Sequence, residues 1–94
     1  MLFAIIALLK PGGDDALIKY SGELNEQIGA NAEQISVAGA LRDKDSQRRG
    51  YLAFFEGNSI GEARKWMEES PIYRDDLYES VEVLQYEVEI GRLG

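Results

Sequence analysis

Residues 2–9 form a run of eight consecutive apolar residues, LFAIIALL, and no other feature of the chain restricts its fold as strongly. The run stops at the sequence KPGG, and its short length together with this stop predicts a strand rather than a helix. Successive side chains of a strand point to opposite faces of the sheet, so both faces of this strand are apolar. Such a strand needs a cover on each side, and it is too short to cross a bilayer.

The residues that follow predict a helix and then a hairpin. We expect a helix over 14–33, because its apolar residues recur at spacings of three and four. These residues are Leu17, Tyr20, Leu24 and Ile28. Strands are expected over 35–41 and 51–55, and the polar residues 42–50 connect them as a long hairpin tip. The strand over 51–55 is again apolar on both faces.

A second helix is expected to begin after Ser59, because Ser59 and Glu62 fit a capping box at a helix start. It should end before Ser70, since the residue that precedes a proline disfavours helical geometry. Ser70 and Pro71 then suit the N-cap and the first position of a short helical turn over 72–75.

The last strand is expected over 78–90, and the parity of its apolar residues changes near Val83-Leu84, which indicates either a bulge or a stretch whose second face is also buried. The chain 1–94 then forms one domain of the α+β class, with the ferredoxin-like order βαββαβ and an antiparallel four-stranded sheet. Two helices cover only one face of such a sheet, and an uncovered apolar face on the order of several hundred Å² is rare in monomers. We therefore expect a homodimer with its sheets packed face to face, a dimeric α/β barrel. The alternative is a monomer whose extra helical turn and hairpin tip cover the second face.

The composition excludes several kinds of chemistry. The chain has no Cys and no His, which excludes disulfides, thiol nucleophiles, and catalysis or metal binding by imidazole. Its net charge of −7 argues against nucleic acid and against anionic membrane surfaces as partners. No spacing of acidic residues predicts a metal site, and no motif predicts a cofactor. We expect a cytoplasmic protein whose first residues already belong to the fold.

Residues 62–83, EARKWMEESPIYRDDLYESVEV, resemble the YciI family of YCII-related domains. Members of this family have an E-A-x-x-W helix, then D-P-Y or D-P-F with a short turn, then a Y-E-x-V-x-V strand. The similarity extends loosely to 37–41, VAGAL, and it implies a dimeric ferredoxin-like barrel. The family is thought to use a His on the first helix and the Asp of the D-P pair as acid and base. Here the Asp position is Ser70 and the His position falls near Gly22, so the resemblance implies a relative that lacks this pair.

The residues expected to line a ligand pocket are Tyr20, Arg42, Ser70, Tyr73 and Tyr86. Each also has a plainer explanation. The tyrosines, together with Tyr78, either orient an aromatic ligand or belong to the core or an interface, with the hydroxyl at the wet edge. Arg42 belongs to the basic hairpin tip 42–49, which either binds an anion or is a solvated loop of mixed charge. Ser70 either takes the place of the catalytic Asp or simply caps a helix.

The sequence assigns no catalytic residue, because a general acid or base needs a pKa near neutrality and no His is present. Glu87 and Glu89 would suit that role if a cleft buried them, but not on a solvated strand face. The favoured hypothesis is a diverged YciI-like protein that binds a small molecule or acts as an accessory protein. The first alternative is an enzyme of isomerase, dehalogenase or lyase type acting on a small aromatic or lactone-like metabolite, as relatives in the wider superfamily do. The second is a structural or partner-binding dimer.

Overall fold

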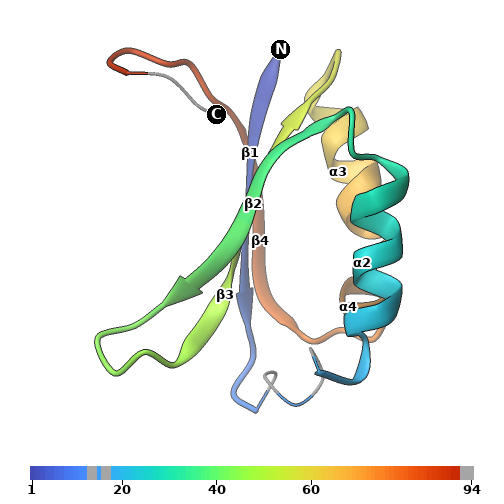
Figure 1. Cartoon of the computed structure of the whole chain (residues 1–94), viewed down its shortest axis with the longest axis vertical. Coiled ribbons are helices and arrows are strands. Elements are labelled where there is room, and N and C mark those ends of the chain that lie inside the picture. The colour runs from blue at the N-terminus through green and yellow to red at the C-terminus, as the bar shows by residue number, and fades with distance from the viewer. Residues whose placement is uncertain (13–14, 16–17, 92–94) are drawn as a thin grey trace.

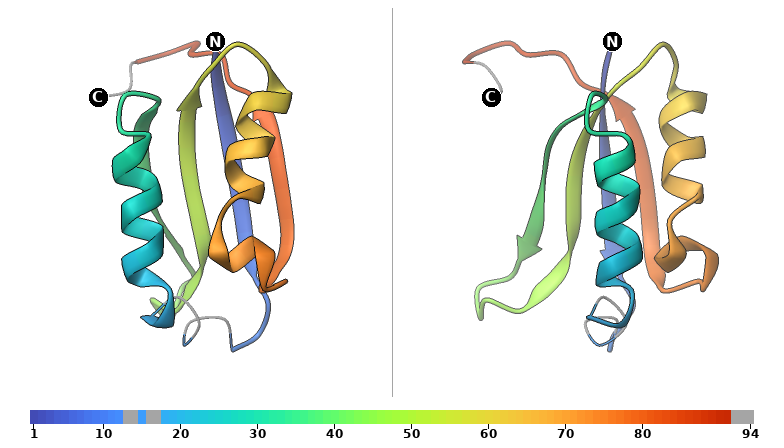
Figure 2. Two further views of the ribbon diagram at one scale, coloured as in Figure 1. Left: turned by 90° about the vertical axis from the view of Figure 1, so that its right-hand side faces the viewer. Right: turned by 45° about the vertical axis from the view of Figure 1, so that its right-hand side comes forward.

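The computed structural model describes residues 1–12, 15 and 18–91, and it confirms the expected α+β fold. The strands are β1 (Leu2–Leu9), β2 (Ile35–Arg42), β3 (Arg48–Glu56) and β4 (Tyr78–Gln85), and the helices are α2 (Ser21–Ala30), α3 (Ile60–Glu68) and α4 (Pro71–Arg74). The strands form one antiparallel sheet in the order β2-β3-β1-β4. These helices all lie on the same side of the sheet, so the chain forms one layer of helices and one layer of strands (Figure 1, Figure 2).

The odd-numbered side chains of β1 form the core beneath the helices. Phe3 and Ile5 have no exposed surface, and pairing places Ile5 opposite Ala53 of β3 and Val83 of β4. These strands therefore present one continuous apolar layer to the helices. The side chains of α3 that join this layer are Ala63, Trp66 and Met67. Burial of each large apolar side chain here stabilises the fold by about 1.5–3 kcal/mol.

The even-numbered side chains of β1 point to the opposite face, which no element of the described residues covers (Figure 1). Leu8 of β1, Val37 of β2 and Leu84 of β4 are 37%, 41% and 53% exposed. The short helix α4 does not reach this face, because its Ile72 is buried in the core on the helix side. The expectation that the helices of one chain hide only one face is confirmed.

Gly50 lies in the middle of the sheet, where β3 is paired with Leu8 of β1 and Leu41 of β2. A Cβ atom at this position would lie 1.9 Å from the carbonyl oxygen of Ala7 and 3.0 Å from the Cα atom of Leu8. Both are backbone atoms of a central strand and cannot move aside without disturbing the pairing. The close approach of β1 and β3 therefore requires glycine at position 50.

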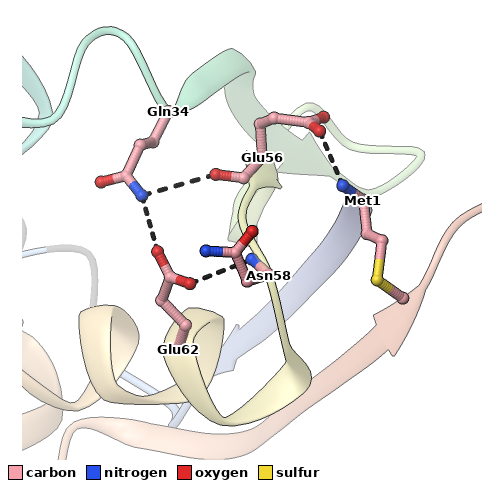
Figure 3. Close-up of polar contacts among 5 residues, drawn as sticks. All are labelled: Met1, Gln34, Glu56, Asn58 and Glu62. Carbon is pink, nitrogen blue, oxygen red and sulfur yellow. Dashed lines mark hydrogen bonds and ion pairs between the residues drawn. The ribbon is translucent and has the colours of Figure 1, made fainter.

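The predicted capping box at the start of α3 is present in a shifted form. The hydroxyl oxygen of Ser59 accepts a hydrogen bond from the N–H of Glu62 at 3.1 Å. The Glu62 carboxylate accepts one from the N–H of Asn58 at 3.0 Å, one residue before the position that the standard box uses. The side-chain amide of Gln34 donates to the other carboxylate oxygen at 2.9 Å, which ties the start of β2 to α3 (Figure 3).

The structure also confirms the predicted break between the second helix and the short turn. α3 ends at Glu68, before Ser70, as expected. The hydroxyl oxygen of Ser70 caps α4 by accepting a hydrogen bond from the N–H of Ile72 at 3.3 Å, and Pro71 is the first helical residue. The short helix covers 71–74, so it begins at Pro71 as expected and ends one residue before the predicted end at Asp75.

Two predicted boundaries in the first half of the chain differ from the observed ones. The described part of the predicted helix 14–33 includes α2, which covers 21–30, while Leu17 of its expected stripe lies outside the described residues. The hairpin tip is shorter than predicted, and β3 begins at Arg48 instead of residue 51. The reason is the carboxylate of Asp43, which accepts hydrogen bonds from the N–H groups of Asp45 and Gln47 and closes a compact turn.

The last strand ends at Gln85, so the predicted extension to Ile90 is wrong. β4 pairs only with β1, and β1 begins at Leu2, so the strand has no partner beyond this point. The final contact is a hydrogen bond of 2.8 Å from the N–H of Tyr86 to the carbonyl oxygen of Leu2. Residues 86–91 turn away from the sheet on the side opposite the helices (Figure 1).

Of the two explanations for the change of parity near Val83-Leu84, the bulge is wrong, because both residues pair regularly with β1. The pairing shifts instead at Glu79, where Leu8 faces Ser80 and Leu9 faces Tyr78. The change of parity in the sequence has a different cause. β4 turns Val81 and Val83 towards the helices, whereas Leu84 belongs to the uncovered face, which is apolar as well.

Candidate functional site

A cavity of about 200 Å³ lies between α2 and the strands β2 and β3, on the helix side of the sheet. The α2 residues that line it are Ser21, Leu24, Asn25 and Ile28, and the strand residues are Ala38, Gly39, Arg48 and Tyr51. Pockets for drug-sized ligands measure roughly 300–1,000 Å³, and an engineered cavity of about 150 Å³ is large enough for benzene. The cavity therefore suits a compound with about one ring.

The local sequence explains why this space is not filled. The stripe of α2 faces the sheet as predicted, but Leu24 and Ile28 are only partly buried, and α2 has no fully buried residue. The facing residue of β2 is Ala38, whose methyl group is too small to reach the helix. The small side chain at this position leaves a gap beneath α2 that a larger apolar residue would close.

Arg48 enters the cavity wall because β3 contains an extra residue. Leu41 pairs with Gly50, but the next residue, Arg42, pairs with Arg48, so Arg49 has no partner on β2. This irregularity is a β-bulge, and it interrupts the alternation of side chains along β3. Regular alternation would place Arg48 on the same face as Gly50, away from the helices. The bulge instead brings Arg48 to the side of Tyr51.

Two tyrosine hydroxyls lie together beside the cavity. Tyr51 is 4% exposed and Tyr78 is 7% exposed, and their ring centroids are 6.2 Å apart. Burial, followed by the neighbouring Tyr78, raises the pKa of Tyr51 far above its ordinary value. Burial also raises the pKa of Tyr78 to about 12, although Tyr51, Ser70 and the charge of Arg48 all act to lower it. Both hydroxyls are therefore protonated at neutral pH.

These tyrosines and Arg48 carry polar atoms without partners. Within the described residues, the Tyr51 and Tyr78 hydroxyls and the Nε atom of Arg48 are shielded from solvent and make no hydrogen bond of good geometry, although the two hydroxyls are close enough to influence each other. Most buried polar groups in proteins have at least one partner, so this grouping marks the cavity as the candidate functional site.

Of the predicted pocket residues, Ser70 lies nearest to this cluster. It is 1% exposed and lies beside Tyr78, although its hydroxyl already caps α4. Tyr20 is partly buried against the core, and its hydroxyl donates a hydrogen bond to Asp75. Tyr73 donates to the carboxylate of Glu68 at 3.3 Å. None of these residues lines the cavity under α2.

The remaining predicted residues lie elsewhere. The Arg42 guanidinium donates to the carbonyl oxygen of Ser46 at 2.8 Å, within its own hairpin. Tyr86 lies on the uncovered face, where its ring is 5.0 Å from that of Phe54 in an edge-to-face arrangement. Glu87 and Glu89 are exposed beyond the end of β4 and do not enter the cavity. The structure therefore does not bring these side chains together with the cavity.

The part of the chain that the structure describes contains no group of three acidic side chains placed to hold a metal ion. Among residues 1–12, 15 and 18–91, no helix is both long and apolar enough to cross a membrane.

No family model and no curated protein matches this chain. Solved structures do share its fold. The 5-chloro-2-hydroxyhydroquinone dehydrochlorinase TftG from Burkholderia phenoliruptrix AC1100, in complex with 2,5-dihydroxybenzoquinone, matches with a TM-score of 0.83 and 21% identity, over 93% of this chain and 94% of that chain. A proposed antibiotic biosynthesis monooxygenase from Bacteroides thetaiotaomicron VPI-5482 matches with a TM-score of 0.56 and 18% identity, over 100% and 93% of the two chains. These similarities establish the fold as that of the dimeric α+β barrel class.

Proposed function

We propose that this protein binds a small ring compound in the cavity between α2 and the sheet. The observation that carries the proposal is the composition of the cavity wall. Leu24 and Ile28 offer apolar surface for a ring, while Arg48 and Tyr51 offer fixed polar groups that can orient it. The similarity in fold to TftG, which was solved with a quinone, supports an oxygenated ring as the ligand.

We also propose that the chain is a diverged YciI-like cytoplasmic protein that binds a ligand or assists a partner enzyme. The positions of the family's acid/base pair carry Ser70, which caps a helix, and Gly22, which has no side chain. Within the cavity wall, Arg48 is permanently protonated and burial keeps Tyr51 neutral, so neither accepts a proton near pH 7. The chemistry of the cavity therefore favours binding over proton transfer.

A second candidate function is catalysis on a small aromatic or lactone-like compound. The similarity to TftG favours it, because that protein is a dehydrochlorinase. Such a reaction would need a proton acceptor, and the described wall of the cavity supplies none. Release of chloride from a chlorinated hydroquinone, measured with purified protein, would establish this second function in place of simple binding.

We propose that the protein acts as a homodimer whose uncovered sheet faces pack together. The face carries exposed apolar residues from β1, β2 and β4, and the fold class supports a second copy as its cover. The segment after β4 leaves on this same side, and its Val88 and Ile90 are 44% and 96% exposed (Figure 2). A second chain would bury these side chains as well.

A matched pair of variants tests the proposed cavity. Ala38→Leu fills the gap beneath α2, whereas Ala30→Leu adds the same side chain at an exposed position of α2 that does not line the cavity. We expect 2,5-dihydroxybenzoquinone to raise the melting temperature of the wild type and of Ala30→Leu, but not that of Ala38→Leu. Isothermal titration calorimetry should likewise show that the wild type and the control variant bind the quinone and that Ala38→Leu does not. Equal binding by the two variants would contradict the proposal, as would a wild type that binds no quinone, phenol or lactone.

A further inference from the structure

Three hydrogen-bond donors converge beside the cavity without an acceptor. Among the described residues they are Arg48 Nε, Tyr51 Oη and Tyr78 Oη, all of them shielded from solvent. A buried donor without an acceptor costs free energy, and native proteins leave few such groups. The two hydroxyls are neighbours and can pair with each other, but Arg48 Nε can only donate, so among the described residues it is the group that lacks an acceptor.

Arg48 is the one charged residue among the described residues that line the cavity, in a protein whose net charge is −7. Within the described residues, no carboxylate lies within ion-pair distance of Arg48, although Asp15 and Asp43 line a neighbouring surface pocket with it. The charge of Arg48 acts to lower the pKa of both Tyr51 and Tyr78 against the larger effect of burial, so Arg48 lies close enough to act on both hydroxyls. A partly buried guanidinium without a counter-ion gains most from an anionic partner.

We infer that the compound bound in this cavity is an anion, whose carboxylate or phenolate-type oxygen accepts hydrogen bonds from Arg48 and Tyr51. The inference rests on the proposed function, because it requires the cavity to hold a small molecule. Tyr51 keeps its proton at neutral pH and can therefore donate to the ligand. Tyr78 lies next to Tyr51 and Ser70, and both act to lower its pKa as hydrogen-bond donors to its oxygen, so an acceptor in the cavity would compete with Tyr78 for the Tyr51 proton.

Benzoate and benzamide provide a direct test, because they share one ring and nearly the same shape but differ in charge. In calorimetric titrations at neutral pH and low salt, we expect the wild type to bind benzoate roughly tenfold more tightly than benzamide. Arg48→Gln should abolish this preference. Arg49→Gln changes the net charge equally at the neighbouring exposed position and should preserve it. Tyr51→Phe keeps the ring but removes the hydroxyl. It should weaken the binding of benzoate about fivefold and leave the binding of benzamide unchanged.

The possible outcomes are distinct. Equal binding of the two compounds overturns the inference, and so does a wild type that does not bind benzoate. Equal losses in Arg48→Gln and Arg49→Gln overturn it too, because general attraction of charges would then explain the preference. Urea unfolding of each variant verifies that it is folded. Failure of the proposed cavity itself would show separately, as quinone binding that Ala38→Leu does not reduce.

Discussion

The two faces of the sheet are built from the same strands but lie in different environments. On β1, Phe3 and Ile5 point towards the helices and have no exposed surface. On the opposite face, Leu8 is 37% exposed, and Leu84 of the adjacent strand is 53% exposed. The side chains on the two faces are similarly apolar, so residue type does not distinguish the faces. The position of the helices does.

We assign a different role to each face, namely ligand binding to the helix-covered face and dimerisation to the uncovered face. The helix-covered face contains the buried core and, next to α2, the cavity with Arg48 and Tyr51. The uncovered face contains no comparable cluster of buried polar atoms among the described residues, but it has the exposed apolar area that we assign to a second copy. Changes on one face should therefore leave the task of the other face intact.

Gly50→Ala is expected to have the largest effect, because it disturbs the backbone that both faces share. The new Cβ would lie 1.9 Å from the carbonyl oxygen of Ala7, so β1 and β3 must separate. We expect a loss of more than about 3 kcal/mol in the free energy of unfolding, measured by urea denaturation. Gly39→Ala is the control, since no atom lies within 4 Å of its added Cβ, and it should cost less than about 1 kcal/mol. Similar losses for both variants would show that the close approach at Gly50 does not limit stability.

Leu84→Asp tests the uncovered face alone. A carboxylate buried between two sheets without a partner is costly, so we expect the dimer to weaken by roughly a hundredfold, as measured by multi-angle light scattering over a dilution series. Binding of a ligand in the cavity should stay unchanged, because Leu84 lies on the other side of the sheet. Ile60→Asp is the matched control on α3, where the exposed isoleucine is 47% accessible. A wild type that is monomeric at micromolar concentration would refute the assignment of this face.

The smallest expected effect is on the stability of the protein at alkaline pH, and it comes from the buried tyrosines of the covered face. Burial raises the pKa of Tyr78 to about 12, above the ordinary value near 10, and the pKa of Tyr51 is raised too. The unfolded chain therefore loses these protons at lower pH than the folded chain, and stability falls as pH rises above 10. Urea midpoints between pH 9 and about 11.5 should fall less steeply in Tyr51→Phe than in the wild type. In Tyr86→Phe, on the uncovered face, the urea midpoint should fall with pH as in the wild type. If the midpoints of all three proteins fell equally steeply, the raised pKa of Tyr51 would be contradicted.

Much of the fold could be predicted because it depends on local patterns. The apolar run 2–9, the Ser59 cap and the Ser70-Pro71 break each determine an element within a few residues. The end of β4 could not be predicted in this way. Residues 86–90 alternate as a strand would, but a strand also needs a partner, and the position of Leu2 on β1 decides where pairing stops.

The candidate site was harder to predict, because it depends on contacts between distant segments. Arg48 looked like one of several basic residues in a solvated tip, and only the bulge at Arg49 turns it towards Tyr51. Tyr51 carried a usable signal, since a hydroxyl in a strand that is apolar on both faces needs a buried partner. Nothing in the sequence indicated that Ala38 would face a gap under α2, because that gap depends on how far the helix lies from the sheet.

The bulge in β3 gives the cavity a form of redundancy. Two consecutive arginines occupy the point where the strand changes its alternation, and in a regular hairpin Arg49 would take the helix-side position instead of Arg48. A guanidinium therefore reaches the space beneath α2 in either alignment of the two strands. A change in the length of the tip that removed the bulge would put Arg49 in the place of Arg48 and preserve the positive charge, whereas with the bulge present Arg49 stays exposed.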